Sequence, residues 1–167
     1  KEEVSLPAAM ESFSERGLAS VTVRGRAAPE EEISVPYKGT RLFGSELRRQ
    51  VDSWVANGVA EPSFADAIHL VLHNPDWMDL RDVNIALLGA GAEMAPTRSL
   101  LRWGARVHAI DLPRPGIWER LTAITRSTAG SLRVPIPLDA QGQPPFVVEG
   151  DVHPDDDATI CSAAGVD

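Results

Sequence analysis

The pattern of apolar and polar positions changes near residue 81, from separate helices and short strands to a regular alternation of strand and helix. Before that point, alternating residues predict strands and apolar residues at helical spacing predict helices. The elements predicted there are a helix at 7–16, a strand at 19–24, a short edge strand around Ile33 and Val35, a helix at 45–57 and a helix that begins at Ser63 and stops at Asn74. Ser45 and Ser63 are expected to cap the last two helices.

The second part of the chain has the order of elements that is typical of α/β proteins. Val83–Leu88 is an almost continuous apolar run, as in a strand that is buried on both faces of a parallel sheet. The elements predicted after it are a helix at 96–103, a strand at 106–110, a helix at 115–127, strands at 132–136 and 146–148, and a helix at 154–164. We therefore predict a three-layer α/β fold with a doubly wound parallel sheet. An N-terminal α+β extension is assigned to residues 1–43 and the α/β domain to residues 44–167.

Charge is distributed unevenly along the chain. The 167 residues include 16 basic and 24 acidic side chains, which gives a formal net charge of −8. This acidity argues against a nucleic-acid partner, because phosphate backbones are bound by clustered basic surface. Residues 81–130 differ from this overall excess of acidic residues, because they contain seven arginines and four acidic residues. A positive segment favours an anionic small molecule as ligand, although a solvated helix face is the simpler explanation of these arginines.

Several other classes of protein are excluded by the composition. Cys161 is the one cysteine, so an internal disulfide framework and a metal site with several cysteines are both excluded. No apolar run approaches the roughly 20 residues of a membrane span, so no membrane partner is expected. The chain begins Lys-Glu-Glu without a signal peptide, and we expect a cytoplasmic location. Asp66, His69 and His73 share a helix face, but a solvated polar face explains them and no metal site is predicted.

The candidate chemistry lies where Val83–Leu88 ends and the chain continues as Gly89-Ala90-Gly91-Ala92. Gly89 permits a tight turn, Gly91 lets the backbone approach a pyrophosphate closely, and the following helix offers unpaired amides to the anion. Asp111 ends the next predicted strand, 22 residues after Gly89. A carboxylate at that position can accept hydrogen bonds from the ribose hydroxyls of adenosine. The alternatives are a structural turn at the two glycines and a capping or turn role for Asp111.

This order of strand, glycine pair, helix, strand and acid resembles the Rossmann-fold NAD(P)-binding family, over about residues 81–167. The continuation is similar to the cofactor-binding half of short-chain dehydrogenases, in which an Asp-Val pair after the third strand lies beside the adenine. The resemblance gives that role to Asp151, which Val152 follows. It implies an NAD(P)-dependent oxidoreductase domain with an unidentified small-molecule substrate. Asp111 favours NAD over NADP, because a 2′-phosphate would meet its charge, although Arg114 could reverse that preference.

Three features depart from the family pattern. The third glycine of the motif is absent, and Met94 or Ala95 stands in its place. Glu93 brings a negative charge to the expected phosphate site. The Tyr-x-x-x-Lys pair of short-chain dehydrogenases is also missing, since the one tyrosine, Tyr37, lies upstream of the motif. The resemblance therefore implies nucleotide binding and assigns no catalytic residue.

Two alternative functions stay open. S-adenosylmethionine-dependent methyltransferases also combine a Gly-x-Gly turn with an acid after the next strand, but they usually have an acid where Leu87 stands and a glycine where Glu93 stands. A non-catalytic scaffold domain with the same fold is the other alternative, and Glu93 is its best support. A complete fold of this type has about six strands. We therefore expect other segments, or further domains of a longer chain, to complete the three or four strands predicted here.

Overall fold

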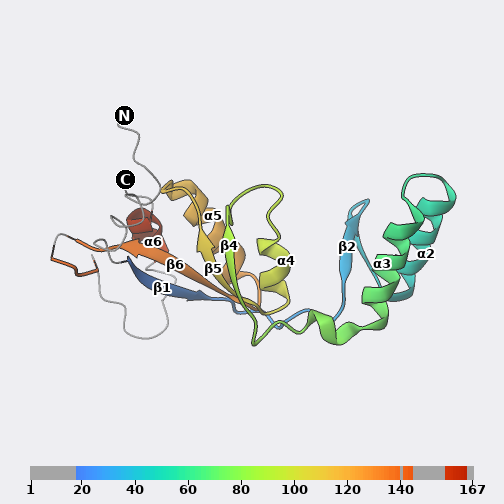
Figure 1. Cartoon of the computed structure of the whole chain (residues 1–167), viewed down its shortest axis with the longest axis horizontal. Helices are drawn as coiled ribbons and strands as arrows, with labels where there is room; N and C mark the ends of the chain where they lie inside the picture. The colour runs from blue at the N-terminus through green and yellow to red at the C-terminus, as the bar shows by residue number, and fades with distance from the viewer. Residues whose placement is uncertain (1–17, 140, 145–156, 165–167) are drawn as a thin grey trace, which may run out of the picture.

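The structure, a computed structural model, describes residues 18–139, 141–144 and 157–164. Its main part is a mixed α/β unit built on a four-stranded, mostly parallel sheet. The strands are β1 (Leu18–Arg24), β4 (Asn84–Leu88), β5 (Arg106–Ile110) and β6 (Ser131–Pro137), in the spatial order β1-β6-β5-β4. Strands β4, β5 and β6 run parallel, and β1 pairs antiparallel with β6 (Figure 1). The parallel core is compatible with the Rossmann-like fold that the sequence predicts.

Three helices pack on one face of this sheet. They are α4 (Thr97–Arg102), α5 (Pro115–Arg126) and α6 (Asp157–Ala164). Trp118 of α5 is 1% exposed and lies in the same apolar core as Val107 of β5 and Leu132 of β6. Alternate residues of each strand point into this core, because successive side chains of a strand face opposite sides. The predicted positions of β1, β4, β5, β6, α4 and α5 are confirmed to within one or two residues.

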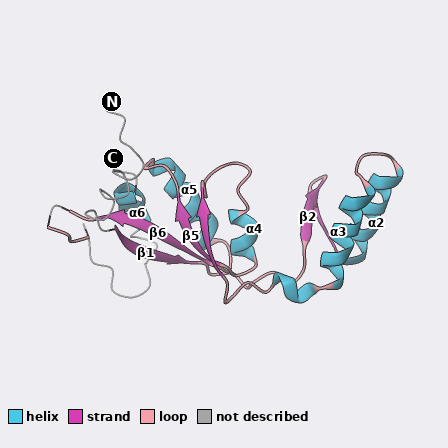
Figure 2. Cartoon of the chain, in the orientation of Figure 1, coloured by secondary structure: helices cyan, strands magenta, loops and turns pink. Residues whose placement is uncertain are grey.

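The other face of the sheet has no helix on it among the described residues (Figure 2). The strand at Val83–Leu88 was expected to be buried on both faces, and this prediction is wrong. Asn84 and Ala86 of β4 are exposed, and Leu88 is 76% exposed. An apolar run shows that a strand avoids water on at least one face, but it does not show that a second layer is present. The described part of the sheet thus has two layers, and the third layer stays a prediction.

A second apolar cluster forms apart from the sheet. Strands β2 (Ser34–Tyr37) and β3 (Thr40–Phe43) form a hairpin that packs with helices α2 (Gly44–Ala56) and α3 (Pro62–His73). Figure 1 shows this unit beyond the short helix η1 (Pro75–Met78), away from the strands of the main sheet. The expected domain boundary between residues 43 and 44 falls inside this unit, and β1 of the expected extension belongs to the main sheet.

Local details of this second unit differ from the sequence-based expectation. Strand β3 was not predicted; Lys38 and Gly39, with φ of 47° and 81°, form the tight turn that pairs it with β2. The expected caps at Ser45 and Ser63 are wrong. Helices α2 and α3 begin after Phe43 and Glu61, and neither end has a side-chain cap.

Some predicted elements lie outside the described residues, namely the helix at 7–16, the strand at 146–148 and the beginning of the helix at 154–164. Within the described ranges, no helix combines the length and the apolar character that crossing a bilayer requires.

An ion pair joins the main sheet unit to the segment that leads into β2. Both carboxylate oxygens of Glu30 accept hydrogen bonds from the Arg102 side chain at the end of α4. The same guanidinium donates to Ser34 Oγ at 2.8 Å, and the Glu30 amide donates to the Arg102 carbonyl at 2.9 Å. The hydrogen bond from Arg102 lowers the pKa of Glu30, and partial burial of the carboxyl opposes this change. The charged form of Glu30 is thus the one that the fold stabilises.

We expect Glu30→Gln to destabilise the protein in a pH-dependent way. A carboxyl whose pKa is lowered by folding contributes stability above its ordinary pKa and loses it as the pH falls through the folded value. The variant should be less stable by about 1 kcal/mol at pH 7, as is typical of a partly exposed ion pair. The difference should shrink as the pH falls below the ordinary pKa of a glutamate, about 4.3, and through the lowered pKa of Glu30 in the folded state. Urea unfolding at several pH values measures this, with Glu31→Gln as the control; a difference that does not depend on pH contradicts the assignment.

Gly130 is a second point on which the fold depends. A Cβ at this position would lie 2.4 Å from the Ala105 carbonyl oxygen and 3.0 Å from Leu101 Cα. Gly130→Ala should therefore lower the free energy of unfolding by about 1–3 kcal/mol or more, because backbone atoms would have to move. Gly116 of α5 is the matched control, since a Cβ added there would have nothing within 4 Å. Thermal unfolding should show Gly116→Ala unchanged or slightly stabilised, and equal effects at both positions would refute this account of the packing.

Candidate functional site

The Gly-x-Gly turn and Asp111 lie together at the carboxyl edge of the sheet. Strands β4 and β5 are parallel neighbours with Leu88 opposite Ile110, so the residues that follow them emerge side by side. The Gly91 amide donates to Asp111 Oδ2 at 2.6 Å, and the Leu112 amide donates to Asp111 Oδ1 at 2.7 Å. Asp111 is half-buried, and its carboxylate fastens the turn after β4 to the end of β5.

Both glycines are required by the geometry of this turn. Gly89 has a φ of 69°, in the left-handed region that side chains disfavour. At Gly91 the obstacle is space, because a Cβ there would lie 2.5 Å from Ile117 Cγ2 and 3.2 Å from Asp111 Oδ2. The turn is held from the other side by Thr97, whose hydroxyl donates to the Ala90 carbonyl at 2.5 Å. The turn therefore requires glycine at both positions, whether or not a ligand binds.

The amides that were expected to hold a pyrophosphate already have partners within the chain. The Gly89 amide donates to the Ile110 carbonyl at 2.7 Å, and the Ala90 amide reaches the same oxygen at 3.4 Å. The Ala92 amide donates to the Gly89 carbonyl at 2.9 Å. Together with the bond from Gly91 to Asp111, all four amides of the motif are engaged.

Two further amides of the same turn have no acceptor among the described residues. The Ala95 amide donates to the Ala92 carbonyl at 3.1 Å, so Glu93 and Met94 occupy the middle of a β-turn. The amides of these two residues donate to no described group. Helix α4 begins at Thr97 and has six residues, so its amino end does not follow Gly91 directly as the motif had suggested. The available backbone donors thus lie two residues further along than the sequence indicated.

A cavity of about 530 Å³ adjoins the turn on the helix side. Its wall contains Gly91, Glu93 and two arginines, Arg98 of α4 and Arg120 of α5. The Arg120 guanidinium also donates a hydrogen bond to the Gly91 carbonyl. Glu93 is exposed at the rim of the same cavity, so the negative charge that departs from the family pattern lies near two positive ones. Arg120 was missed in the sequence; the only signal for it was the excess of arginines in residues 81–130.

Other candidates from the sequence have structural roles or cannot be placed. Asp151 lies outside the described residues. His69 Nε2 lies 3.1 Å from Asp52 Oδ1 on α2, and His73 Nδ1 lies 2.6 Å from the His69 carbonyl oxygen. Within the described ranges, no three histidine, cysteine or acidic side chains are grouped so that they could hold a metal ion. Cys161 is buried against Thr122, and burial raises the pKa of its thiol, as expected for a packing role.

Comparison with models of protein families, with curated proteins and with solved structures finds no match to this chain.

Removing the Asp111 carboxylate should release the Gly91 amide. In Asp111→Ala this amide has no acceptor in the turn, so its hydrogen exchange should become faster, and the protein should lose about 1–2 kcal/mol of stability. Asp111→Asn keeps one acceptor oxygen and should give a smaller change. Amide exchange followed by NMR measures the effect, with the exposed Asp82→Ala as the control. Unchanged exchange at Gly91 in Asp111→Ala would show that this bond does not hold the turn.

Proposed function

We propose that this chain is a nucleotide-binding domain that takes NAD(H) at the carboxyl edge of its sheet and serves an NAD(P)-dependent oxidoreductase. The observation that carries the proposal is the direct contact between the Gly-x-Gly turn and Asp111, which come from neighbouring parallel strands. In doubly wound α/β proteins, ligands bind outside the carboxyl ends of the strands. The likeness of this segment to the Rossmann-fold family supports the same site.

Asp111 retains the capacity to bind ribose while it holds the turn. An ionised carboxylate has about four acceptor positions on its two oxygens. The amides of Gly91 and Leu112 use one position on each oxygen, so one position on each is left for a ribose hydroxyl. NADPH carries an additional phosphate on the 2′ position of the same ribose. The negative charge of that phosphate would be repelled by the Asp111 carboxylate, so NADH is proposed over NADPH.

The diphosphate needs donors other than those that the motif suggested. The amides of Glu93 and Met94 and the guanidinium groups of Arg98 and Arg120 border the turn and are proposed for this role. The guanidinium group of an arginine can donate two hydrogen bonds to the oxygens of a phosphate, and the unpaired amides of the turn are further donors. Asp151 keeps its proposed place beside the adenine. The cofactor would supply the hydride chemistry, and the residues on the substrate side are not assigned.

We further propose that the sheet is one half of a three-layer, doubly wound Rossmann-like fold. The outer edge of β4 has no partner strand among the described residues, and the described helices that pack on this sheet lie on one face. In the complete fold, the second half would continue the sheet from β4 and bring helices to the opposite face of the added strands.

A non-catalytic scaffold is the second candidate, and one observation favours it. All four amides from Gly89 to Ala92 are satisfied within the chain, so the turn is complete without a ligand. This candidate predicts that no nucleotide binds.

Titration of the protein with NADH, NADPH and S-adenosylmethionine tests the proposal. We expect NADH to bind with saturation and NADPH to bind at least about tenfold more weakly. Asp111→Ala should weaken NADH binding by at least about tenfold, since hydrogen bonds to a charged group contribute about 1.5–3 kcal/mol. Asp66→Ala, which removes an exposed carboxylate on α3, should leave the affinity unchanged.

Three outcomes would overturn the proposal. Binding of S-adenosylmethionine without any dinucleotide would assign the methyltransferase alternative. Failure of all three ligands would leave the scaffold as the better account. Equal NADH affinity of the wild type and Asp111→Ala would remove Asp111 from the site.

A further inference from the structure

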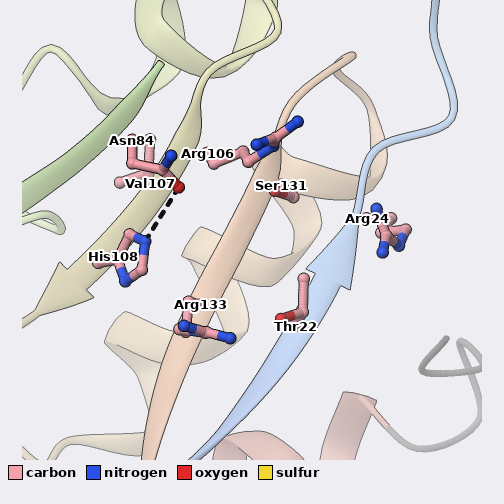
Figure 3. Close-up of a pocket in the computed structure, with 8 residues that line it drawn as sticks. All are labelled: Thr22, Arg24, Asn84, Arg106, Val107, His108, Ser131 and Arg133. Atoms are coloured by element: carbon pink, nitrogen blue, oxygen red, sulfur yellow. Dashed lines mark hydrogen bonds between the residues drawn. The ribbon is translucent and has the colours of Figure 1, made fainter. Parts of the chain in front are cut away.

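The open face of the sheet carries a group of polar and basic side chains near the amino ends of the parallel strands (Figure 3). They line a cavity of about 290 Å³. The lining residues are Thr22 and Arg24 of β1, Asn84 of β4, Arg106, Val107 and His108 of β5, and Ser131 and Arg133 of β6. Three of the eight are arginines and none is acidic, in a chain whose net charge is −8.

The register of the strands brings these side chains together. Ser131 pairs with Arg24 on one side and with Arg106 on the other, so the two arginines flank the serine in one row across the sheet. Arg133, two residues along β6 from Ser131, points to the same face and pairs with His108. Neighbouring strands lie about 4.8 Å apart and residues two apart on a strand about 6.6 Å apart. The guanidinium groups are therefore within reach of a single small anion above Ser131.

The charges of Arg106 and Arg133 are weakly neutralised by the described residues. Asp82 lies 3.0 Å from Arg106 Nη2, but its side chain is 96% exposed and it lies outside the cavity lining. The Arg133 side chain forms no ion pair or hydrogen bond with the described residues. His108 is oriented by Asn84, whose Oδ1 lies 3.4 Å from His108 Nε2, the contact drawn in Figure 3. A positive surface on which the Arg133 guanidinium donates to no described group is suited to an anion.

We propose that this group is a second binding site, distinct from the turn at Gly91, for a small ligand that carries a phosphate group. Arg106 and Arg133 bind the phosphate oxygens, and the Ser131 hydroxyl donates to it between them. A phosphate has enough oxygens and charge to accept hydrogen bonds from two guanidinium groups at once, whereas a single carboxylate pairs with one guanidinium. The cavity volume is close to the lower end of the range for small-molecule sites.

The geometry separates this site from the proposed nucleotide site and from a nucleic-acid surface. Asn84, Arg106 and Ser131 are the first residues of their strands, whereas the turn follows the last residue of β4. Four residues of strand span about 13 Å, and the arginines face the side of the sheet without helices. Single-stranded nucleic acids are bound by basic grooves with aromatic platforms for the bases. No phenylalanine, tyrosine or tryptophan is present in the lining of this cavity.

Titration with inorganic phosphate, followed through the side-chain Nε–Hε NMR signals of Arg106 and Arg133, tests this proposal. We expect saturable shifts of both signals at constant ionic strength, and at least tenfold weaker binding of acetate. Arg133→Gln and Arg106→Gln should each weaken phosphate binding at least tenfold. Arg49→Gln, an exposed arginine of α2, is the charge-matched control and should have no effect. Asp111→Ala should also have no effect, so that failure of this site and failure of the nucleotide site are distinguishable.

Further experiments identify the source of the phosphate and control for folding. Glycerol 3-phosphate is used as a phosphate ester beside inorganic phosphate, and saturable binding of either compound supports the site. The compound that binds more tightly shows whether a free or an esterified phosphate fits better. Ser131→Ala, which removes one hydroxyl and no charge, should weaken binding several-fold with an unchanged thermal unfolding curve. Absence of saturable shifts at both arginines, equal binding of acetate, or an equal loss in Arg49→Gln would overturn the proposal.

Discussion

The hydrogen bond from the Gly91 amide to the Asp111 carboxylate is the contact around which the carboxyl edge of this protein is organised. It joins two segments that are 20 residues apart in the chain. It is possible because β4 and β5 are parallel neighbours whose last residues lie opposite each other. The absence of a Cβ at Gly91 lets Ile117 of α5 approach the turn, and Arg120 of the same helix donates a hydrogen bond to the Gly91 carbonyl. Helix, turn and acid therefore form one unit.

This unit supplies one part of the proposed nucleotide site and leaves another part to neighbouring residues. The acid and the turn are adjacent, as dinucleotide binding requires, and the acid has acceptor positions left for a ribose. The four amides of the motif are nevertheless occupied, so a diphosphate would depend on the next two amides and on arginines. Arginines thus occur at both proposed sites. One site is beside the turn, and the other is on the helix-free face of the sheet, where Arg106 pairs with Ser131 and Arg133 lies two residues along the strand of Ser131.

Much of the fold was predictable from local patterns, and what was missed depends on distant parts of the chain. The helices at 45–57 and 115–127 were predicted from local sequence, and the structure places them within one or two residues. The pairing of β1 with β6 joins residues more than 100 positions apart, which no local pattern records. The exposed face of β4 was missed for a related reason: apolar composition does not tell whether another layer covers a strand. In the site, the closeness of Gly91 and Asp111 followed from the strand order, whereas the position of Arg120 depends on how α5 crosses the sheet.

The most direct test of the central claim is a map of NADH binding by amide ¹H–¹⁵N chemical shifts on the wild-type protein. The account predicts that the largest changes occur at Gly91, Glu93, Met94 and Leu112, which surround the contact between the turn and Asp111. The signals of Ser131 and Arg133, on the other face of the sheet, should change little. Saturating changes that leave the four turn and edge amides unmoved, or no changes at millimolar NADH, would contradict it.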